Sequence, residues 1–141
     1  MSSPIEIVPR SDADVQELFG LARSTFAELP GWNDRRVLEV LESDVVFVAR
    51  ERGRPAGYVA LRREPEDAVV VEQIFVAPGH EHRGIGRTLL AHAEGYAIAE
   101  HAATLRIVVE ETNLPARSFY RRWGFVPVET ELFELVLPRP G

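Results

Sequence analysis

The spacing of hydrophobic residues changes several times along the chain, and each change predicts a new element. A short opening strand is expected at Ile5–Val8. Hydrophobic positions three or four residues apart, typical of one helix face, then run over Val15–Leu29. We expect the polar segment Ser11–Asp14 to begin this helix with a side-chain cap and an acidic first turn, and Pro30–Gly31 to end it.

A second, shorter helix is expected next, with Asn33 as its cap. The period then becomes that of strands, in three runs rich in β-branched residues: Val45–Ala49, Gly57–Leu61 and Ala68–Val76. Turn residues at Arg52–Pro55 and Glu64–Asp67 separate these runs. The pattern therefore predicts an antiparallel meander.

The last part of the chain alternates helices with strands. The expected elements are helix Gly84–Glu100, strand Leu105–Val109, helix Asn113–Gly124, and strands Phe125–Val128 and Glu131–Leu137. The strands Ala68–Val76 and Leu105–Val109 are joined by a helix, and such a crossover makes two strands of one sheet parallel. The order β-α-α-β-β-β-α-β-α-β-β predicts an α/β fold, with a mixed central sheet of about seven strands and helices on both faces. Since no linker or repeat interrupts the sequence, we expect one domain over residues 1–141.

Charge and composition narrow the function classes. All 16 basic residues are arginine against 22 acidic residues, for a net charge of −6. An acidic chain is a poor nucleic-acid binder and suits a cationic small molecule or a peptide amine, although solubility explains the charge equally well. The missing lysine excludes a Schiff base and a P-loop, and the missing cysteine excludes disulfides and a thiol nucleophile. The four histidines form no convincing metal site, so no metal is expected: His80, His82, His92 and His101.

The sequence carries no sign of a membrane segment or an export signal. No apolar run approaches the roughly 20 residues of a membrane span. The segment Met1–Arg10 lacks the basic-then-apolar layout of a signal peptide. We therefore expect a soluble cytoplasmic protein with no membrane partner.

The first motif with chemical meaning is Arg83-Gly84-Ile85-Gly86-Arg87-Thr88, which lies between a predicted strand and a predicted helix. Its glycines allow a tight turn, and the free amides of a helix start suit a phosphate or pyrophosphate. Two glycines between a strand and a helix also occur where they only form a turn and bind no ligand. It is no dinucleotide fingerprint, because Leu89 stands at the position of the third glycine.

The second motif is Asn113-Leu114-Pro115-Ala116-Arg117-Ser118-Phe119-Tyr120-Arg121-Arg122-Trp123-Gly124-Phe125. Taken alone, it is a capped short helix, and Tyr120 is an ordinary core aromatic. Taken together and in this order, the two motifs are much more specific, and the chain resembles the GNAT family of N-acetyltransferases over nearly its whole length. The strand Ile74–Pro78, which leads into the first motif, agrees with this resemblance.

The resemblance implies the GNAT fold, acetyl-CoA as the cosubstrate, and a direct attack by the acceptor amine. The pyrophosphate would lie on the backbone amides of about His82–Arg87, and a main-chain amide near Phe75 or Val76 would polarise the acetyl carbonyl. Tyr120 would protonate the leaving thiolate. The implied donor-binding residues are Phe75, Val76, His82, Arg83, Gly84, Ile85, Gly86, Arg87, Thr88, Asn113 and Arg117, although a solvated helix face is the simpler explanation for Arg117.

One departure from the family pattern lies next to the first motif. The family commonly has Arg or Gln three residues before the first core glycine, whereas this sequence has Glu81, followed by His82. A carboxylate facing a pyrophosphate is unfavourable. We expect Glu81 to turn to solvent and the donor to bind, with weaker affinity.

Candidates for the base and the acceptor pocket rest on position. Glu72 is the one polar residue on a strand face with Ala68, Val70, Ile74 and Val76, which suits a general base. The competing interpretation is a strand-edge residue that faces solvent or pairs with an arginine. Glu110 and Glu111 are weaker candidates. The resemblance places the acceptor near the connection of the first two helices, where Phe26 and Trp32 would line a pocket and make a cation–π contact with a substrate ammonium, and Glu28 would add negative charge at the rim. The alternative is that Trp32 only covers the core.

The function predicted from all of this is acetyl transfer from acetyl-CoA to a primary amine of a small molecule or peptide. Two alternatives stay open: a non-catalytic module that binds acyl-CoA or a partner protein, and an acyltransferase with a longer donor. A homodimer through the late strands fits the resemblance, and Leu132–Leu135 would serve that interface or simply the core.

Overall fold

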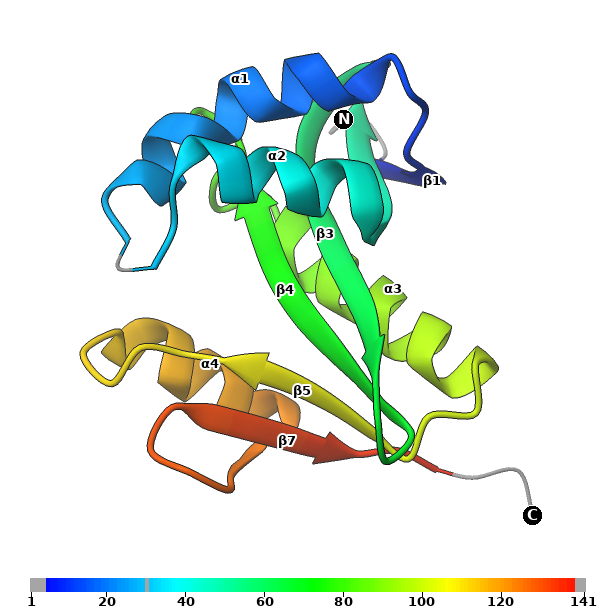
Figure 1. The fold of residues 1–141 in the computed structure, drawn as a ribbon, viewed down its shortest axis with the longest axis vertical. Coiled ribbons are helices and arrows are strands. Elements are labelled where there is room, and N and C mark those ends of the chain that lie inside the picture. Colours follow the sequence, from blue (N-terminus) through cyan, green and yellow to red (C-terminus); the bar gives the residue numbers. More distant parts are fainter. Residues whose placement is uncertain (1–4, 30, 139–141) are drawn as a thin grey trace. The chain divides into compact units, whose positions relative to one another are not determined.

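The elements follow the predicted order. The computed structural model describes residues 5–29 and 31–138. Within them, seven strands form one mixed sheet in the order β1-β2-β3-β4-β5-β7-β6, accompanied by four helices (Figure 1). The bounds are β1 Ile5–Pro9, α1 Asp14–Ala27, α2 Asp34–Ser43, β2 Val45–Glu51, β3 Arg54–Glu64, β4 Ala68–Val76, α3 Ile85–Ala99, β5 Thr104–Val108, α4 Leu114–Trp123, β6 Val126–Pro127 and β7 Leu132–Val136.

The largest difference from the prediction is the length of β3. The turn predicted at Arg52–Pro55 is confined to Arg52 and Gly53, whose φ angles of 56° and 77° are both left-handed. Two left-handed residues match the twist of a hairpin, so the strands pair immediately on either side of them. Arg54 therefore already pairs with Glu51, and β3 begins three residues earlier than expected.

Two compact units make up the chain. The first consists of Met1–Leu61 and Gln73–His92, and the second of Arg62–Glu72 and Ala93–Gly141. The elements β3, β4 and α3 each contribute to both units. The single domain expected over residues 1–141 stays a prediction.

In the first unit, helices cover both faces of the strands. The cluster on one face joins α1 and α2 to β2, β3 and the end of β4, and its buried members are Val15, Leu18, Ala22, Phe26, Val37, Val40, Leu41, Val46, Val48, Tyr58, Ala60, Phe75 and Ala77. Along β2, Val46 and Val48 belong to this cluster, whereas Phe47 packs edge-on against His92 of α3 at 4.4 Å between ring centroids. This alternation is the period of a strand that is covered on both sides.

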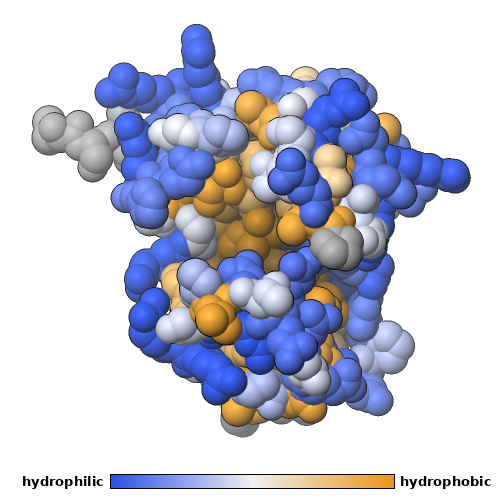
Figure 2. All heavy atoms as spheres, turned by 90° about the vertical axis from the view of Figure 1, so that its left-hand side faces the viewer, coloured by the Kyte–Doolittle hydropathy of each residue, from blue (hydrophilic) through white to orange (hydrophobic). Residues whose placement is uncertain are grey.

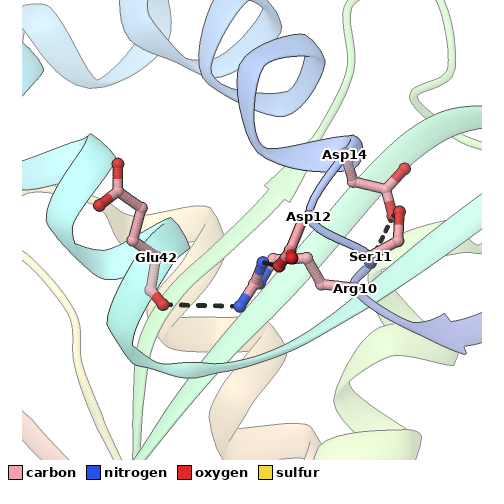
Figure 3. A network of polar contacts seen from close by, with 5 residues as sticks. All are labelled: Arg10, Ser11, Asp12, Asp14 and Glu42. Carbon is pink, nitrogen blue, oxygen red and sulfur yellow. Dashed lines mark hydrogen bonds and ion pairs between the residues drawn. The ribbon is translucent and has the colours of Figure 1, made fainter.

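The start of α1 differs from the prediction. The helix begins at Asp14, and the residue before it, Ala13, supplies no side-chain cap. Instead, the backbone N–H and the hydroxyl of Ser11 both donate to the Asp14 carboxylate, at 2.9 and 3.0 Å (Figure 3). Arg50 of β2 donates to the other oxygen of Asp14. The predicted acidic first turn is confirmed, with Asp14 and Glu17.

The neighbouring residues of the same segment tie β1 to α2. Arg10, which directly follows β1, donates to the backbone carbonyl of Glu42 at 3.5 Å and pairs with Asp12 at 3.4 Å (Figure 3). At the other end of α2, the Asn33 side chain accepts from the N–H of Arg36, so the predicted cap is confirmed. Pro30, predicted to help end α1, lies outside the described residues.

The second unit contains the parallel pair of strands and α4. Ala68–Val71 of β4 run parallel to Thr104–Ile107 of β5, as the crossover argument predicted, and β7 pairs antiparallel with β5 and β6. Asn113 caps α4 by accepting from the N–H of Ala116, and Gly124 ends the helix with a φ of 125°. Trp123 donates to Glu94 of α3 at 2.8 Å.

Most of the face seen in Figure 2 is hydrophilic, with smaller hydrophobic areas between. Phe133, part of the stretch considered for a dimer interface, is fully buried in the second unit, and the homodimer stays a prediction. Among residues 5–29 and 31–138, no helix has the length and hydrophobicity needed to cross a membrane.

The contacts of Asp14 predict how stability depends on pH. Burial alone would raise the pKa of Asp14, but the hydrogen bonds from Ser11 and Arg50 outweigh it and hold the pKa below its ordinary value of 3.8. The unfolded chain therefore takes up this proton first as pH falls. The stabilisation by Asp14 is complete above the unfolded value and is lost as pH drops through the lower folded value.

We expect Asp14→Asn to lower the free energy of unfolding at neutral pH and the gap to wild type to narrow below about pH 4. Urea titrations across that range measure it. Asp12→Asn is the matched control, because Asp12 is fully exposed and contributes little to stability. A gap that stays constant down to about pH 2 would contradict the assignment.

Candidate donor and acceptor sites

The end of β4 lies unusually close to β3. At Gly57, a Cβ atom would collide with the backbone carbonyl oxygen of Phe75 and would stand 3.3 Å from the Cα of Val76. It would also lie 3.4 Å from a methyl group of Ile85, the first residue of α3. Glycine is therefore needed at position 57, since backbone cannot move aside as a flexible side chain can. This contact places the predicted carbonyl-polarising residues beside the start of α3.

The loop from β4 to α3 has the backbone shape that the first motif predicted. Gly84, directly before the helix, has a φ of 78°, and His82 has a φ of 65°. A Cβ at Gly84 would meet none of the described residues within 4 Å, so the backbone angle, and not space, favours glycine there. Thr88 closes the first turn, because its N–H and hydroxyl both bond to the Gly84 carbonyl at 3.0 and 2.9 Å.

The first turn of α3 is suited to an anion. The first N–H groups of any helix have no partner within it, and the helix dipole adds partial positive charge at this end. A Cβ placed on Gly86, the second helix residue, would lie 3.8 Å from a methyl group of Val76, at the end of β4. The predicted donor residues of this segment, His82, Arg83, Gly84, Ile85, Gly86, Arg87 and Thr88, are thus gathered at one helix start in the first unit.

Glu81 does not oppose this arrangement. Its side chain is exposed, as predicted, and its carboxylate accepts from the N–H of Gly79 at 2.9 Å. Hydrogen bonds from the N–H groups of Glu81 itself and of Gly79 lower the pKa of this carboxyl. The carboxylate is thereby engaged with the loop's own backbone.

Arg83 is engaged with a residue that the sequence did not reveal. It donates to Oε1 of Glu51 at 2.8 Å, and His80 contacts the same oxygen through Nδ1 at 3.0 Å. Glu51 is the last residue of β2 and is only 6% exposed. Nothing in the local pattern marks it, because its partners lie about thirty residues further along the chain.

Tyr120 lies in the second unit, on the buried side of α4. Its ring packs edge-on against Phe119 and Phe125, with centroids 5.3 and 5.6 Å away. Burial raises the pKa of Tyr120 to about 12. The hydroxyl is therefore protonated at neutral pH and is able to donate a hydrogen bond.

The two polar donor candidates of α4 both have partners within the second unit. The Asn113 side chain is committed to capping the helix. Arg117 donates to the backbone carbonyl of Thr130 at 2.9 Å and lies over the Phe133 ring at 4.8 Å. These contacts show structural roles for both residues, and their predicted contact with the donor stays a prediction.

Glu72 is paired with an arginine, which was one of the two structural interpretations of this residue, the other being exposure to solvent at a strand edge. Its carboxylate lies 2.6 Å from Arg62 of β3, and its side chain is 10% exposed. Arg62 also contacts Glu64 at 2.8 Å. The role of Glu72 as a general base stays a prediction, now for a carboxylate with a guanidinium neighbour.

The predicted acceptor residues Phe26 and Trp32 do come together. Their ring centroids are 5.4 Å apart, and Phe26 is 6.3 Å from Phe75, whose backbone belongs to the predicted donor site. The guanidinium of Arg36 lies 4.0 Å from the centroid of the Trp32 ring, so the cation–π contact expected for a substrate is made by the protein itself. Glu28 is exposed at the end of α1.

A buried polar pair next to these rings was also missed. The Tyr58 hydroxyl donates to Oε1 of Gln73 at 2.7 Å, and the Tyr58 ring is 5.5 Å from that of Phe75. Within the described residues, Nε2 of Gln73 is buried without a hydrogen-bond partner. The signal was a single polar residue among apolar neighbours on the strand face opposite Glu72. Among the described residues, no group of histidine and carboxylate side chains could hold a metal ion.

Comparison with known proteins places the chain in a family. The model of the acetyltransferase (GNAT) family matches residues 13–125. This chain belongs to the GNAT family.

Individual relatives agree with this. Streptothricin acetyltransferase of Streptomyces lavendulae is 40% identical over 74 residues, which are 52% of this chain and 39% of that protein. This chain therefore matches about two-fifths of that relative's length.

Solved structures share the fold. The ribosomal-protein-S18-alanine N-acetyltransferase of Escherichia coli superposes with a TM-score of 0.79 at 20% identity, over 98% of this chain and 97% of that one. A GNAT acetyltransferase of Brucella melitensis, solved with acetyl-CoA, gives 0.76 at 17% identity, over 99% and 92%.

We expect Gly57→Ala to lower the free energy of unfolding by about 1–3 kcal/mol, because the new Cβ would clash with the backbone of Phe75 and Val76 in β4. Chemical denaturation measures the loss. Gly95→Ala is the matched control: within the part of the chain that the structure describes, a Cβ there meets nothing within 4 Å, and alanine is more favourable than glycine in a helix interior by about 0.5–1 kcal/mol. Equal stability of the two variants would show that β3 and β4 do not meet at Gly57.

Proposed function

We propose that this chain transfers an acetyl group from acetyl-CoA to a primary amine of a small molecule or peptide. The observation that carries the proposal is the start of α3, where a left-handed Gly84 exposes the first N–H groups of a 15-residue helix. Membership of the GNAT family supports the reaction class. The acetyl-CoA in the Brucella melitensis structure supports the choice of donor.

The phosphates of the donor would bind mainly to backbone. Arg83 is already paired with Glu51, so N–H groups of His82–Arg87 and the helix dipole would carry most of the attraction. The acetyl end would meet a main-chain amide near Phe75 or Val76.

The chemistry then needs a nucleophile, an electrophile and two proton transfers. The acceptor amine loses a proton, for which Glu72 is the proposed base, and attacks the acetyl carbonyl. A carbon–nitrogen bond forms, and the negative charge on the carbonyl oxygen is stabilised by the amide near Phe75. The carbon–sulfur bond then breaks, and Tyr120 supplies the proton that the departing CoA thiolate takes up.

The acceptor would approach beside Phe26 and Trp32, with Glu28 at the rim. Apolar rings near Phe75 favour an acceptor with a hydrophobic portion next to its amine. The proteins compared above are named for two different acceptors, streptothricin and the alanine of ribosomal protein S18. Both acceptor classes therefore belong in an activity panel.

Calorimetric titration tests the donor site directly. We expect acetyl-CoA and CoA to bind with a Kd on the order of micromolar, and the affinity to fall at high salt because the phosphates carry charge. Parallel titrations with propionyl- and succinyl-CoA test the longer-donor alternative. Absence of binding up to about millimolar ligand would overturn the proposal.

Substitution of Tyr120 separates catalysis from binding. We expect Tyr120→Phe to lower kcat for thiol release by about 10²–10⁴-fold, while CoA affinity stays unchanged because the ring contacts remain. Tyr96→Phe, at a half-buried tyrosine of α3, is the control. Unchanged turnover in Tyr120→Phe would remove this residue from the mechanism. If wild type binds CoA but shows no turnover across the amine panel, the non-catalytic alternative replaces the proposal.

A further inference from the structure

A buried carboxylate on β2 holds the loop that precedes α3. Glu51 Oε1 is contacted by Nδ1 of His80 at 3.0 Å and by Nη1 of Arg83 at 2.8 Å. His80 and Arg83 enclose the segment in which the backbone turns left-handed at His82. Both ends of this segment are therefore fastened to one oxygen atom of a neighbouring strand.

The chemistry of Glu51 makes this fastening strong. An ionised carboxylate that leaves water needs partners, or it loses its charge. Burial alone would raise the pKa of Glu51, but the hydrogen bonds from Arg83 and His80 outweigh it and lower the pKa. Glu51 is thus ionised at neutral pH and bound to a guanidinium, which is the stronger class of hydrogen bond.

The rest of the loop has weaker support. The Ala77 N–H, at the start of the loop, donates to the carbonyl of Ala56 in β3 at 2.8 Å. Beyond Ala77, the described contacts apart from those of Glu51 are the bond from the His80 N–H to the Ala77 carbonyl at 3.0 Å and the Gly79–Glu81 bond, which both lie within the loop. Glu81, His82, Arg83 and Gly84 are all exposed. Of these contacts, those of Glu51 are the ones that tie the part of the loop after Ala77 to a strand.

We propose that Glu51 is a positioning residue for the donor: it fixes the loop so that the N–H groups at the start of α3 point together at the donor phosphates. This inference rests on the proposed function. N–H groups that are already held in place bind a ligand more tightly, because no loop has to be ordered when the ligand arrives. Glu51 itself need not touch the donor.

The proposal makes a prediction whose sign differs from that of simple electrostatics. Glu51 neutralises Arg83 and adds negative charge near an anion site, so if charge alone mattered, Glu51→Gln would bind CoA more tightly. If Glu51 positions the loop, the same variant binds CoA more weakly, although it carries one negative charge fewer. The direction of the change in Kd decides between the two.

The experiment compares wild type and Glu51→Gln by calorimetry with CoA and by steady-state kinetics. We expect Kd and the KM for acetyl-CoA to rise about tenfold, with kcat changed less than about twofold. S-acetyl-N-acetylcysteamine, an acetyl thioester without nucleotide or pyrophosphate, should be used with unchanged kcat/KM. Glu17→Gln, which removes the same charge from an exposed position on α1, should behave as wild type.

Two further measurements keep the test decisive. Arg83→Gln removes the same contact from the loop side. The variant that combines Glu51→Gln with Arg83→Gln should therefore bind CoA about as tightly as the weaker-binding of the two single variants. In Glu51→Gln, hydrogen exchange should become faster at the amides of the loop alone. A generally destabilised variant would instead exchange faster over the whole chain, so the measurement distinguishes the two cases.

The outcomes separate this inference from the proposed function. If wild type fails to bind CoA, the proposed function fails. If wild type binds and Glu51→Gln binds equally or more tightly, only the positioning role is overturned. Equal loss with the truncated thioester, or exchange quickened throughout the chain, would show a general structural role and would also overturn it.

Discussion

The candidate donor site depends on the absence of one side chain. At Gly57, the backbone of β3, the end of β4 and the first residue of α3 meet with no room for a Cβ. Because of this contact, Phe75 and Val76 lie next to the start of α3. In the same stretch of β4, Gln73 and Phe75 contact Tyr58. The candidate donor site and the aromatic cluster of Phe26, Trp32, Tyr58 and Phe75 therefore share one short piece of strand. A single point of close packing therefore sets the position of most of the chemistry in the first unit.

The features that could be predicted from the sequence are local ones. Asn33 and Asn113 cap their helices within three residues, and Gly84 and Gly124 take the conformations that their neighbours require. Each of these depends on a few adjacent residues, so the sequence pattern suffices. The parallel direction of β4 and β5 could be predicted because a helix joins them, and such a connection fixes the direction of the strands on either side of it.

The features that could not be predicted join distant residues. The helix start at Ser11–Asp14 was predicted, but its contact with a distant residue was not: the Asp14 carboxylate, which accepts from Ser11, also accepts from Arg50, 36 residues further along the chain. Glu51 escaped notice for the same reason, since its partners follow 29 and 32 residues later. No periodicity records which charged side chains will meet once the strands are side by side.

The two tryptophans report on different parts of the fold. Trp32 lies against Phe26 under the Arg36 guanidinium in the first unit, and Trp123 is hydrogen-bonded to Glu94 in the second. Since the chain has only these two, replacing either by phenylalanine leaves a single tryptophan, whose emission can be excited selectively at wavelengths that tyrosine and phenylalanine do not absorb. The emission of Trp32 would follow events beside the aromatic cluster, and that of Trp123 would follow α4. The protein thus carries its own pair of spectroscopic reporters, one for each compact unit.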